Sequence, residues 1–339
     1  MIRRRGSRAE KVTLQKRQQK RKKFGAIMML CFMSTAVAMA QMPLPVKSAT
    51  EAERRAAGIK DQHGVINSAD GTCLFYRYWP ATEPWNGHVV VVLHGIGFES
   101  GPYKVVADAL NPRGVDVYGL DARGHGLSCG PRGYLGSAAK VAEDVGAIVA
   151  FAKQQRAAAK IFLVDDSMGC NYALDYAKQY QDQLSGVVLL GPVLAVNKKQ
   201  IWRPSTLLLL PYLVFARRDP VVSLVGKRLD ESSRDPQFVA ERRTDPLAYK
   251  KVSFGYLLDV RRLVPKWKTD IAPVVRLPIL MIAGGHDEVG SRKAFMEFER
   301  LSGSRDKQAQ IVPGVYHTTL WDPRTPEILK VLGDWIVAR

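Results

Sequence analysis

Residues 161–170, IFLVDDSMGC, constrain the fold more than any other stretch of the chain. An apolar run ends abruptly at Ser167 and Gly169, and a helix-compatible segment follows at 171–181. This order predicts a strand, a sharp turn and a helix. A serine at such a corner adopts a sparsely populated backbone geometry with its hydroxyl exposed, and the next amide lies at a helix N-terminus, ready to stabilise an oxyanion. The pattern therefore predicts a nucleophile elbow.

Apolar β-branched runs of the kind found in strands buried on both faces recur along the chain. The expected strands are residues 63–67, 72–79, 88–93, 115–120, 160–164, 186–190, 277–283 and 308–312. The expected helices between them are residues 103–110, 138–155, 168–181, 291–301 and 326–338. This alternation predicts an α/β fold with a mostly parallel central sheet and helices on both faces. The Ser-Ala-Asp-Gly sequence between the first two strands predicts an antiparallel hairpin.

Three polar side chains each follow one of these expected strands. They are Ser167, Asp287 and His317, in chain order. A serine nucleophile needs a base to take its proton, an acid to orient that base, and amide donors for the oxyanion. On a parallel sheet such groups come from loops at the carboxyl ends of the strands. The order nucleophile, acid, base is that of the α/β-hydrolases, so we expect these residues to form a catalytic triad.

Five motifs extend this pattern: His94-Gly-Ile-Gly, Asp121-Ala-Arg-Gly-His-Gly-Leu-Ser-Cys-Gly-Pro-Arg-Gly-Tyr134, Asp166-Ser-Met-Gly169, Thr244-Asp-Pro-Leu247 and Gly314-Val-Tyr-His317. From about Gly71 onward the chain resembles the monoacylglycerol lipase and lysophospholipase branch of the α/β-hydrolases, often labelled serine aminopeptidase-like. The resemblance implies Ser167 as nucleophile, Asp287 as acid and His317 as base, with the backbone N–H groups of Ile96 and Met168 forming the oxyanion hole. It also implies cleavage of single-acyl-chain esters, monoacylglycerols or lysophospholipids, beneath a mobile apolar cap.

The elbow departs from the usual G-x-S-x-G pattern because Asp165 replaces the first glycine. Either an arginine or backbone donors satisfy this carboxylate, or it is buried unpaired with a raised pKa. We expect Asp166 to face the mouth of the pocket. Two carboxylates beside Ser167 favour the imidazolium form of His317 but oppose an oxyanion. A relative that is inactive and only binds its ligand is therefore the main alternative, and aminopeptidase and acyltransferase activities remain open.

Residues 196–264 interrupt the alternation of strands and helices. An insertion of this length between core strands predicts a helical cap over the active site. Its apolar run at 206–216 is expected to line an acyl pocket. In an aminopeptidase, a cap carboxylate would instead hold the free amine of the substrate, and the candidates are Asp219, Asp230 and Glu231.

The N-terminal residues carry most of the excess charge. Residues 1–23 hold eleven Lys or Arg and one acid, so they contribute +10 of the formal +18. An uncharged apolar run at 24–40 follows and ends in Ala-Met-Ala, the layout of a secretory signal. We expect a cleaved signal peptide or a membrane anchor, with the rest of the chain periplasmic, extracellular or anchored to a membrane. Residues 41–59 are expected to be a linker and 60–339 the hydrolase domain.

Other partners and cofactors find little support in the sequence. No aromatic residues are interleaved with the basic tail, so we expect no nucleic-acid partner, whereas residues 24–40 and the cap suit membrane association. The glycines at 95, 97 and 101 imitate a dinucleotide-binding fingerprint, but the third is displaced and a hairpin precedes them. Three cysteines, Cys73, Cys129 and Cys170, follow the apolar run at irregular spacings and indicate at most one disulfide and no metal site. We expect no cofactor.

Some polar residues of the motifs are expected to support the fold. His94 and His125 lie in glycine-rich turns. Asp121 and Arg123 are expected to stabilise the turn that contains them.

Overall fold

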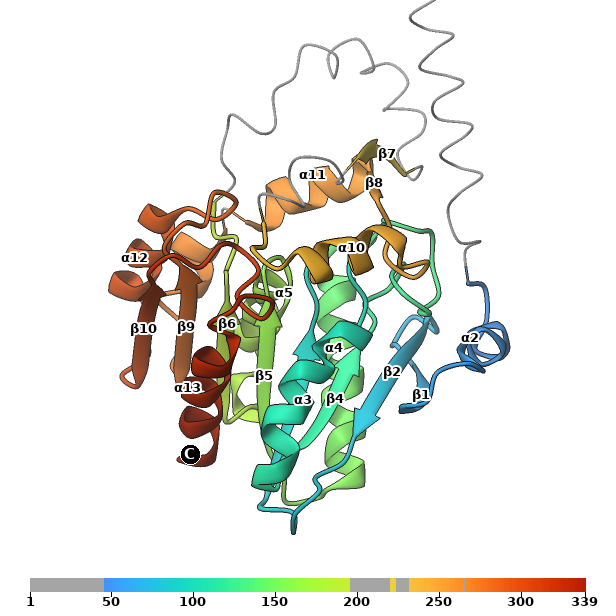
Figure 1. Cartoon of the computed structure of the whole chain (residues 1–339), viewed down its shortest axis with the longest axis horizontal. Coiled ribbons are helices and arrows are strands. Elements are labelled where there is room, and N and C mark those ends of the chain that lie inside the picture. Colours follow the sequence, from blue (N-terminus) through green and yellow to red (C-terminus); the bar gives the residue numbers. More distant parts are fainter. Residues whose placement is uncertain (1–45, 196–219, 224–231, 265) are drawn as a thin grey trace, which may run out of the picture. The chain divides into compact units, whose positions relative to one another are not determined.

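A mixed eight-stranded sheet lies at the centre of the part of the chain that the structure describes (Figure 1). This computed structural model describes residues 46–195, 220–223, 232–264 and 266–339. The strand order is β1-β2-β4-β3-β5-β6-β9-β10. The strands are β1 (Gln62–Asn67), β2 (Cys73–Trp79), β3 (His88–Leu93), β4 (Asp116–Leu120), β5 (Lys160–Asp166), β6 (Gly186–Leu190), β9 (Ile279–Gly284) and β10 (Lys307–Val312). Strand β2 pairs antiparallel with β1 and β4, and the other pairs are parallel.

Helices cover both faces of this sheet (Figure 1). They are α3 (Lys104–Leu110), α4 (Ala138–Gln155), α5 (Gly169–Tyr180), α12 (Arg292–Leu301) and α13 (Thr325–Val337). Short turns of 3-10 or π helix span Gly101–Tyr103, Asn111–Arg113, Gln181–Gln183 and Trp267–Ile271. Buried side chains of α3 and α13 form one apolar core with alternate residues of the central strands, while α4 and α5 pack together on the other face.

The predicted α/β-hydrolase architecture is confirmed. Every expected strand and helix of the sheet layers is present, and each boundary lies within two residues of the prediction. The expected antiparallel hairpin is the β1–β2 pair. Strand β3 illustrates why the prediction works, since all six of its residues are buried and five of them are valine or leucine. Such a run is typical of a strand that is covered on both faces. A strand with one exposed face would instead alternate apolar and polar residues.

Helix α2 (Ala49–Ala56) begins the folded part earlier than the sequence predicts. Ser48 caps it, because its hydroxyl accepts a hydrogen bond from the backbone N–H of Glu51 at 3.2 Å. Ala52 and Ala56 are fully buried against the hairpin. Residues 46–56 therefore belong to the folded part, which the sequence predicts to begin at residue 60. The buried face of α2 consists of alanines between charged residues, so no large apolar side chains mark it in the sequence.

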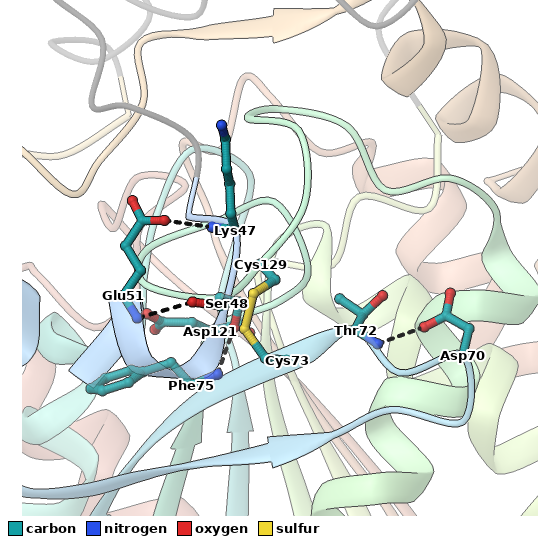
Figure 2. Close-up of a disulfide and its surroundings, with 10 residues drawn as sticks. Lys47, Ser48, Glu51, Asp70, Thr72, Cys73, Phe75, Asp121 and Cys129 are labelled. Atoms are coloured by element: carbon teal, nitrogen blue, oxygen red, sulfur yellow. Dashed lines mark hydrogen bonds between the residues drawn. A yellow bond between two sulfur atoms is a disulfide. The ribbon is translucent and has the colours of Figure 1, made fainter. Parts of the chain in front are cut away.

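A disulfide joins Cys73 of β2 to Cys129 in the loop after β4 (Figure 2). Val46 and Ala52 pack on it, so the bridge ties the hairpin, the loop and the region of α2 together. Cys170 is free and buried. The sequence allowed at most one pair, and the structure identifies that pair.

The segment expected to form the cap is described in part. Its described elements are β7 (Pro220–Ser223), α10 (Pro236–Thr244), β8 (Lys251–Ser253) and α11 (Phe254–Leu263). Strands β7 and β8 form a separate antiparallel pair. The apolar run at 206–216 lies outside the described residues, as do Asp219, Asp230 and Glu231.

Residues 1–45, which include the expected signal or anchor, also lie outside the described part. Among the residues that are described, no helix combines the length and the apolar character needed to cross a membrane.

Candidate active site

Ser167 occupies the corner between β5 and α5. Its φ angle is 54°, and it is the only residue other than glycine with positive φ among the described residues. Residues other than glycine rarely adopt a positive φ angle, and those that are held in this conformation concentrate at functional sites. Gly169 makes the corner possible, since a Cβ at this position would lie 2.5 Å from the carbonyl oxygen of Leu93. The local geometry is therefore that of the predicted elbow.

The three residues expected to form a triad lie in one hydrogen-bonded line. Ser167 Oγ is 2.8 Å from Nε2 of His317, and Nδ1 of His317 is 2.9 Å from Oδ2 of Asp287. The other carboxylate oxygen of Asp287 accepts the backbone N–H groups of Val289 and Gly290, both at 2.8 Å. All three side chains are more than nine-tenths buried. The acid is thus held rigidly and leaves Nε2 of His317 to serve Ser167.

The pKa shifts of Asp287 and His317 favour proton transfer from Ser167 to His317. Burial alone would raise the pKa of Asp287, but His317 and the two amides outweigh it, and the pKa is lowered. Burial would likewise lower the pKa of His317, but the charge and hydrogen bond of Asp287, followed by the charge of Asp166, raise it. Asp287 is therefore an anion at neutral pH, and His317 is a stronger base than free imidazole.

The loop after β3 passes beside Ser167. A Cβ on Gly95 would lie 3.2 Å from Cβ of Ser167, so a larger residue here would push the loop or Ser167 aside by a few tenths of an ångström. The expected oxyanion donors, the amides of Ile96 and Met168, follow Gly95 and Ser167 directly in the chain. Within the described residues, neither amide donates a hydrogen bond.

His94 holds this loop in place. Its Nε2 accepts the backbone N–H of Ala122 at 3.0 Å, so Nδ1 carries the proton that is donated to the carbonyl oxygen of Gly95 at 2.8 Å. Burial lowers the pKa of His94, although the nearby charge of Asp121 opposes this shift. The lowered pKa keeps the ring neutral. The interpretation of His94 as a structural residue agrees with these contacts.

The motif around Asp121 is also structural. Asp121 accepts hydrogen bonds from the N–H and hydroxyl of Ser100 and from the N–H of Leu127. Arg123 bonds both carboxylate oxygens of Asp144 at 2.6 Å and forms an ion pair with Asp70 at 2.9 Å. These bonds secure the loop between β4 and α4, as the sequence predicts.

His125 completes the same loop. Its Nδ1 lies 3.0 Å from the carbonyl oxygen of Arg123, and its Nε2 is bonded to the hydroxyl of Tyr249. Burial holds the pKa of His125 well below its usual value. His125 thus links the loop to the segment between α10 and β8, and its structural interpretation also agrees with the contacts.

Asp165 is fully buried, and neither of its carboxyl oxygens has a hydrogen-bond partner among the described residues. Burial first, and then the charge of Asp166, hold its pKa well above the usual range. Of the two outcomes that the sequence allows, the structure shows the unpaired one. Asp165 is protonated at neutral pH and places no charge beside Ser167.

Asp166 does not face the mouth of the pocket, and that expectation is wrong. It is only 2% exposed, and its Oδ2 accepts the hydroxyl of Tyr103 at 2.7 Å. Burial raises the pKa of Asp166 to about 6, although His317 and Tyr103 counteract the shift. The reason for the error is that strand β5 extends through Asp166, which places its side chain in the interior, in contact with the hydroxyl of Tyr103.

An aromatic cluster beside the site is not foreseen by the sequence analysis. Phe238 of α10 stacks on Trp321 with centroids 4.4 Å apart, and Phe98 stacks on both rings at 6.0 and 5.5 Å. Arg234 adds two bonds to the carboxylate of Asp322, at 2.7 and 2.8 Å. These contacts fasten the described part of the cap segment to the loops that carry Gly95 and His317. Phe98 and Trp321 follow two of the motifs closely, which is the signal that could have revealed them.

Comparison with known proteins identifies the family. The model for the family described as Hydrolase_4, serine aminopeptidase, S33, matches residues 86–324. The chain belongs to this family. It is therefore a member of a group of serine hydrolases that includes lipases and esterases, and the resemblance expected from the motifs is confirmed.

Individual relatives agree with this assignment. The monoacylglycerol lipase of Mycolicibacterium smegmatis is 29% identical over 300 residues, which cover 86% of this chain and 99% of the relative. The uncharacterized protein YnbC of Escherichia coli is 30% identical over 75% of this chain, which spans only 43% of that protein's length. A soluble variant of the Saccharomyces cerevisiae monoglyceride lipase superposes with a TM-score of 0.72 at 20% identity, over 87% of this chain and 97% of that one, and supports the fold.

The described residues contain no group of three His, Cys, Asp or Glu side chains arranged to hold a metal ion.

Proposed function

We propose that this protein hydrolyses carboxylic esters, with Ser167 as nucleophile, His317 as general base and Asp287 as the acid that orients it. The observation that carries this proposal is the line of hydrogen bonds from Ser167 Oγ through His317 to Asp287, at 2.8 and 2.9 Å. The positive φ angle of Ser167 supports it independently.

The geometry suits a two-step mechanism. His317 takes the proton of Ser167 as Oγ attacks the ester carbonyl, and the imidazolium is stabilised by Asp287. The amides of Ile96 and Met168 stabilise the tetrahedral oxyanion. His317 then donates its proton to the departing alcohol, which leaves an acyl-enzyme. A water molecule, deprotonated by His317, attacks the acyl group. His317 then donates this proton to Oγ of Ser167 as the acyl–enzyme bond breaks, which releases the carboxylic acid and free Ser167.

The main alternative, an inactive relative that only binds its ligand, loses its strongest argument. That alternative rested on Asp165 adding a charge beside the nucleophile. Burial keeps Asp165 protonated, so it does not oppose the oxyanion electrostatically. Labelling with a fluorophosphonate tests the point directly. The wild-type protein should be labelled and Ser167→Ala should not, whereas an unlabelled but folded wild-type protein would favour the ligand-binding alternative.

We propose single-acyl-chain lipids of the monoacylglycerol or lysophospholipid type as the substrates. The named function of the M. smegmatis relative supports this choice, as does the apolar run at 206–216. Each methylene buried by a substrate contributes about 0.8 kcal/mol, so kcat/KM for p-nitrophenyl esters should rise steeply from acetate to decanoate. A flat ester profile with efficient cleavage of proline p-nitroanilide would favour an aminopeptidase, the activity that the family description names.

We further propose that the hydrolase domain is exported or anchored to a membrane through residues 1–40. The basic and apolar segments support this proposal, and so does the Cys73–Cys129 disulfide, because such bonds persist mainly outside the cytosol. The mature N-terminus should be Gln41, or the intact protein should fractionate with membranes. Recovery of the full-length protein from the soluble cytosol would contradict both.

A further inference from the structure

The hydroxyl of Tyr103 bridges the two chain segments that meet at Ser167. It accepts the backbone N–H of Gly95 at 3.0 Å and donates to Oδ2 of Asp166 at 2.7 Å. Gly95 precedes Ile96, the expected oxyanion donor, and Asp166 precedes Ser167. Tyr103 is fully buried and Asp166 is 2% exposed, so water does not compete for these bonds. The bridge thus spans the gap between the oxyanion loop and the nucleophile.

We propose that Asp166 and Tyr103 are positioning residues, which hold the oxyanion loop against the nucleophile through the chain Gly95 N–H, Tyr103 hydroxyl, Asp166 carboxylate. This inference rests on the proposed esterase function. The hydroxyl has a single proton, and because that proton is donated to Asp166, a lone pair of the same oxygen accepts the N–H of Gly95. A carboxylate is the strongest partner for this arrangement, because hydrogen bonds to an ionised acceptor are shorter and stronger than neutral ones.

The close packing at this point explains why small displacements matter. A Cβ on Gly95 would lie 3.1 Å from Oδ2 of Asp166 and 3.2 Å from Cβ of Ser167. The loop therefore lies close against both residues, and Nδ1 of His94 donates to the carbonyl oxygen of Gly95 at 2.8 Å. Loss of the Tyr103 bridge would leave the N–H of Gly95 without its acceptor and free the adjoining Ile96 amide to turn away from the oxyanion.

The charge of Asp166 has a second effect, on the catalytic base. The titratable groups whose pKa depends on Asp166, or that shift the pKa of Asp166, are Tyr103, His317, Asp287, Asp165 and Cys170. The charge of Arg242 lowers the pKa of Tyr103. Asp165 and Cys170 are held neutral by burial. Asp166 and Asp287 are consequently the anions that His317 faces in this group. Both raise the pKa of His317, so removing the charge of Asp166 lowers it.

The test compares three variants by kinetics on one p-nitrophenyl ester. Tyr103→Phe removes the bridging hydroxyl and keeps the ring. Asp166→Asn keeps an acceptor for Tyr103 and removes the charge. Tyr172→Phe is the matched control, because Tyr172 is also a buried tyrosine, and its hydroxyl bonds that of Tyr256 at 2.9 Å, away from the Gly95 bridge.

We expect Tyr103→Phe to lower kcat roughly 10- to 100-fold with KM within about twofold, which is less than the loss of an oxyanion donor itself. The double variant Tyr103→Phe, Asp166→Asn should lose little more kcat than Tyr103→Phe alone, because both members act through one bridge. Tyr172→Phe should keep kcat within about twofold while losing a comparable amount of stability.

The pH profile separates positioning from simple structural support. The activity requires neutral His317, so kcat/KM falls as pH drops through the pKa of that residue. In Asp166→Asn this acid limb should move to lower pH, since an opposite charge near His317 has been removed. An acid limb that does not move, or a Tyr103→Phe variant with the kcat of Tyr172→Phe, would overturn the inference.

Failure of the inference is distinguishable from failure of the proposed function. If the wild-type protein neither hydrolyses esters nor reacts with a fluorophosphonate, the esterase proposal fails and the bridge has no oxyanion to serve. If the wild-type protein is active and labelled at Ser167 but the variants of Tyr103 and Asp166 behave like the control, the esterase proposal stands and the inference alone is wrong.

Discussion

Replacing Asp165 with alanine should stabilise the protein, by an amount that grows as the pH rises. Asp165 is 0% exposed, and no described group bonds its carboxyl oxygens. A buried polar group without a partner costs about 1 to 3 kcal/mol. Removing the carboxyl group leaves a small cavity, which costs about 0.5 to 1 kcal/mol. The net gain near pH 4 should therefore lie between about 0 and 2.5 kcal/mol.

Linkage adds a pH-dependent part to this gain. Burial raises the pKa of Asp165 in the folded protein, whereas the unfolded chain has an ordinary carboxyl group of pKa about 4. Above pH 4 the unfolded chain binds fewer protons than the folded protein. The stability of the wild-type protein consequently falls by up to about 1.4 kcal/mol for each pH unit, until the pH reaches the folded pKa. Asp165→Ala lacks this loss.

Urea unfolding of both proteins at pH 5, 6 and 7 measures the effect. The difference in unfolding free energy should widen at each step in favour of Asp165→Ala. Val164→Ala is the matched control, because Val164 is its buried neighbour on β5 and does not titrate, so its effect should be a pH-independent destabilisation. A difference for Asp165→Ala that stays constant with pH, or a variant less stable than the wild-type protein at pH 7, would refute the reasoning.

Three further predictions concern the triad and the disulfide. Ser167→Ala and His317→Ala should each lower kcat by roughly 10⁴ to 10⁶, and the double variant should lose little more; additive losses in ester assays would contradict a triad. Asp287→Asn should move the acid limb of kcat/KM to lower pH, since Asp287 raises the pKa of His317. An acid limb at the wild-type pH would contradict this effect of Asp287 on the base. Replacing Cys73 and Cys129 together by alanine should lower the unfolding free energy by about 4 kcal/mol, measured in urea, given their separation of 56 residues; a loss below about 1 kcal/mol would count against the bridge.

The sheet and the catalytic line could be predicted because both depend on local patterns. A fully buried parallel strand needs an unbroken apolar run, and β3 and β6 have one. Parallel strands end at one edge, so residues that follow different strands are brought together by the topology alone. Ser167, Asp287 and His317 are far apart in the sequence, yet their approach follows from this rule.

Features that depend on pairs of distant side chains could not be predicted in the same way. Three cysteines allow three different single pairs, and only the register of β2 against the loop after β4 selects Cys73 and Cys129. The stack of Phe98, Phe238 and Trp321 joins three segments whose relative placement no local pattern specifies. Such contacts depend on how the whole domain packs, and local sequence patterns do not specify that packing.

The two adjacent aspartates show the same division in the site itself. Successive residues of a strand point to opposite faces, so Asp165 and Asp166 enter different environments although they are neighbours in the chain. Asp166 meets a donor, Tyr103, and a basic partner, His317, which limit the rise of its pKa to about 6. Asp165 meets neither and remains protonated. One of the two carboxyl groups is therefore available as a charge beside the catalytic base, and the other is a neutral group whose removal should cost the reaction nothing.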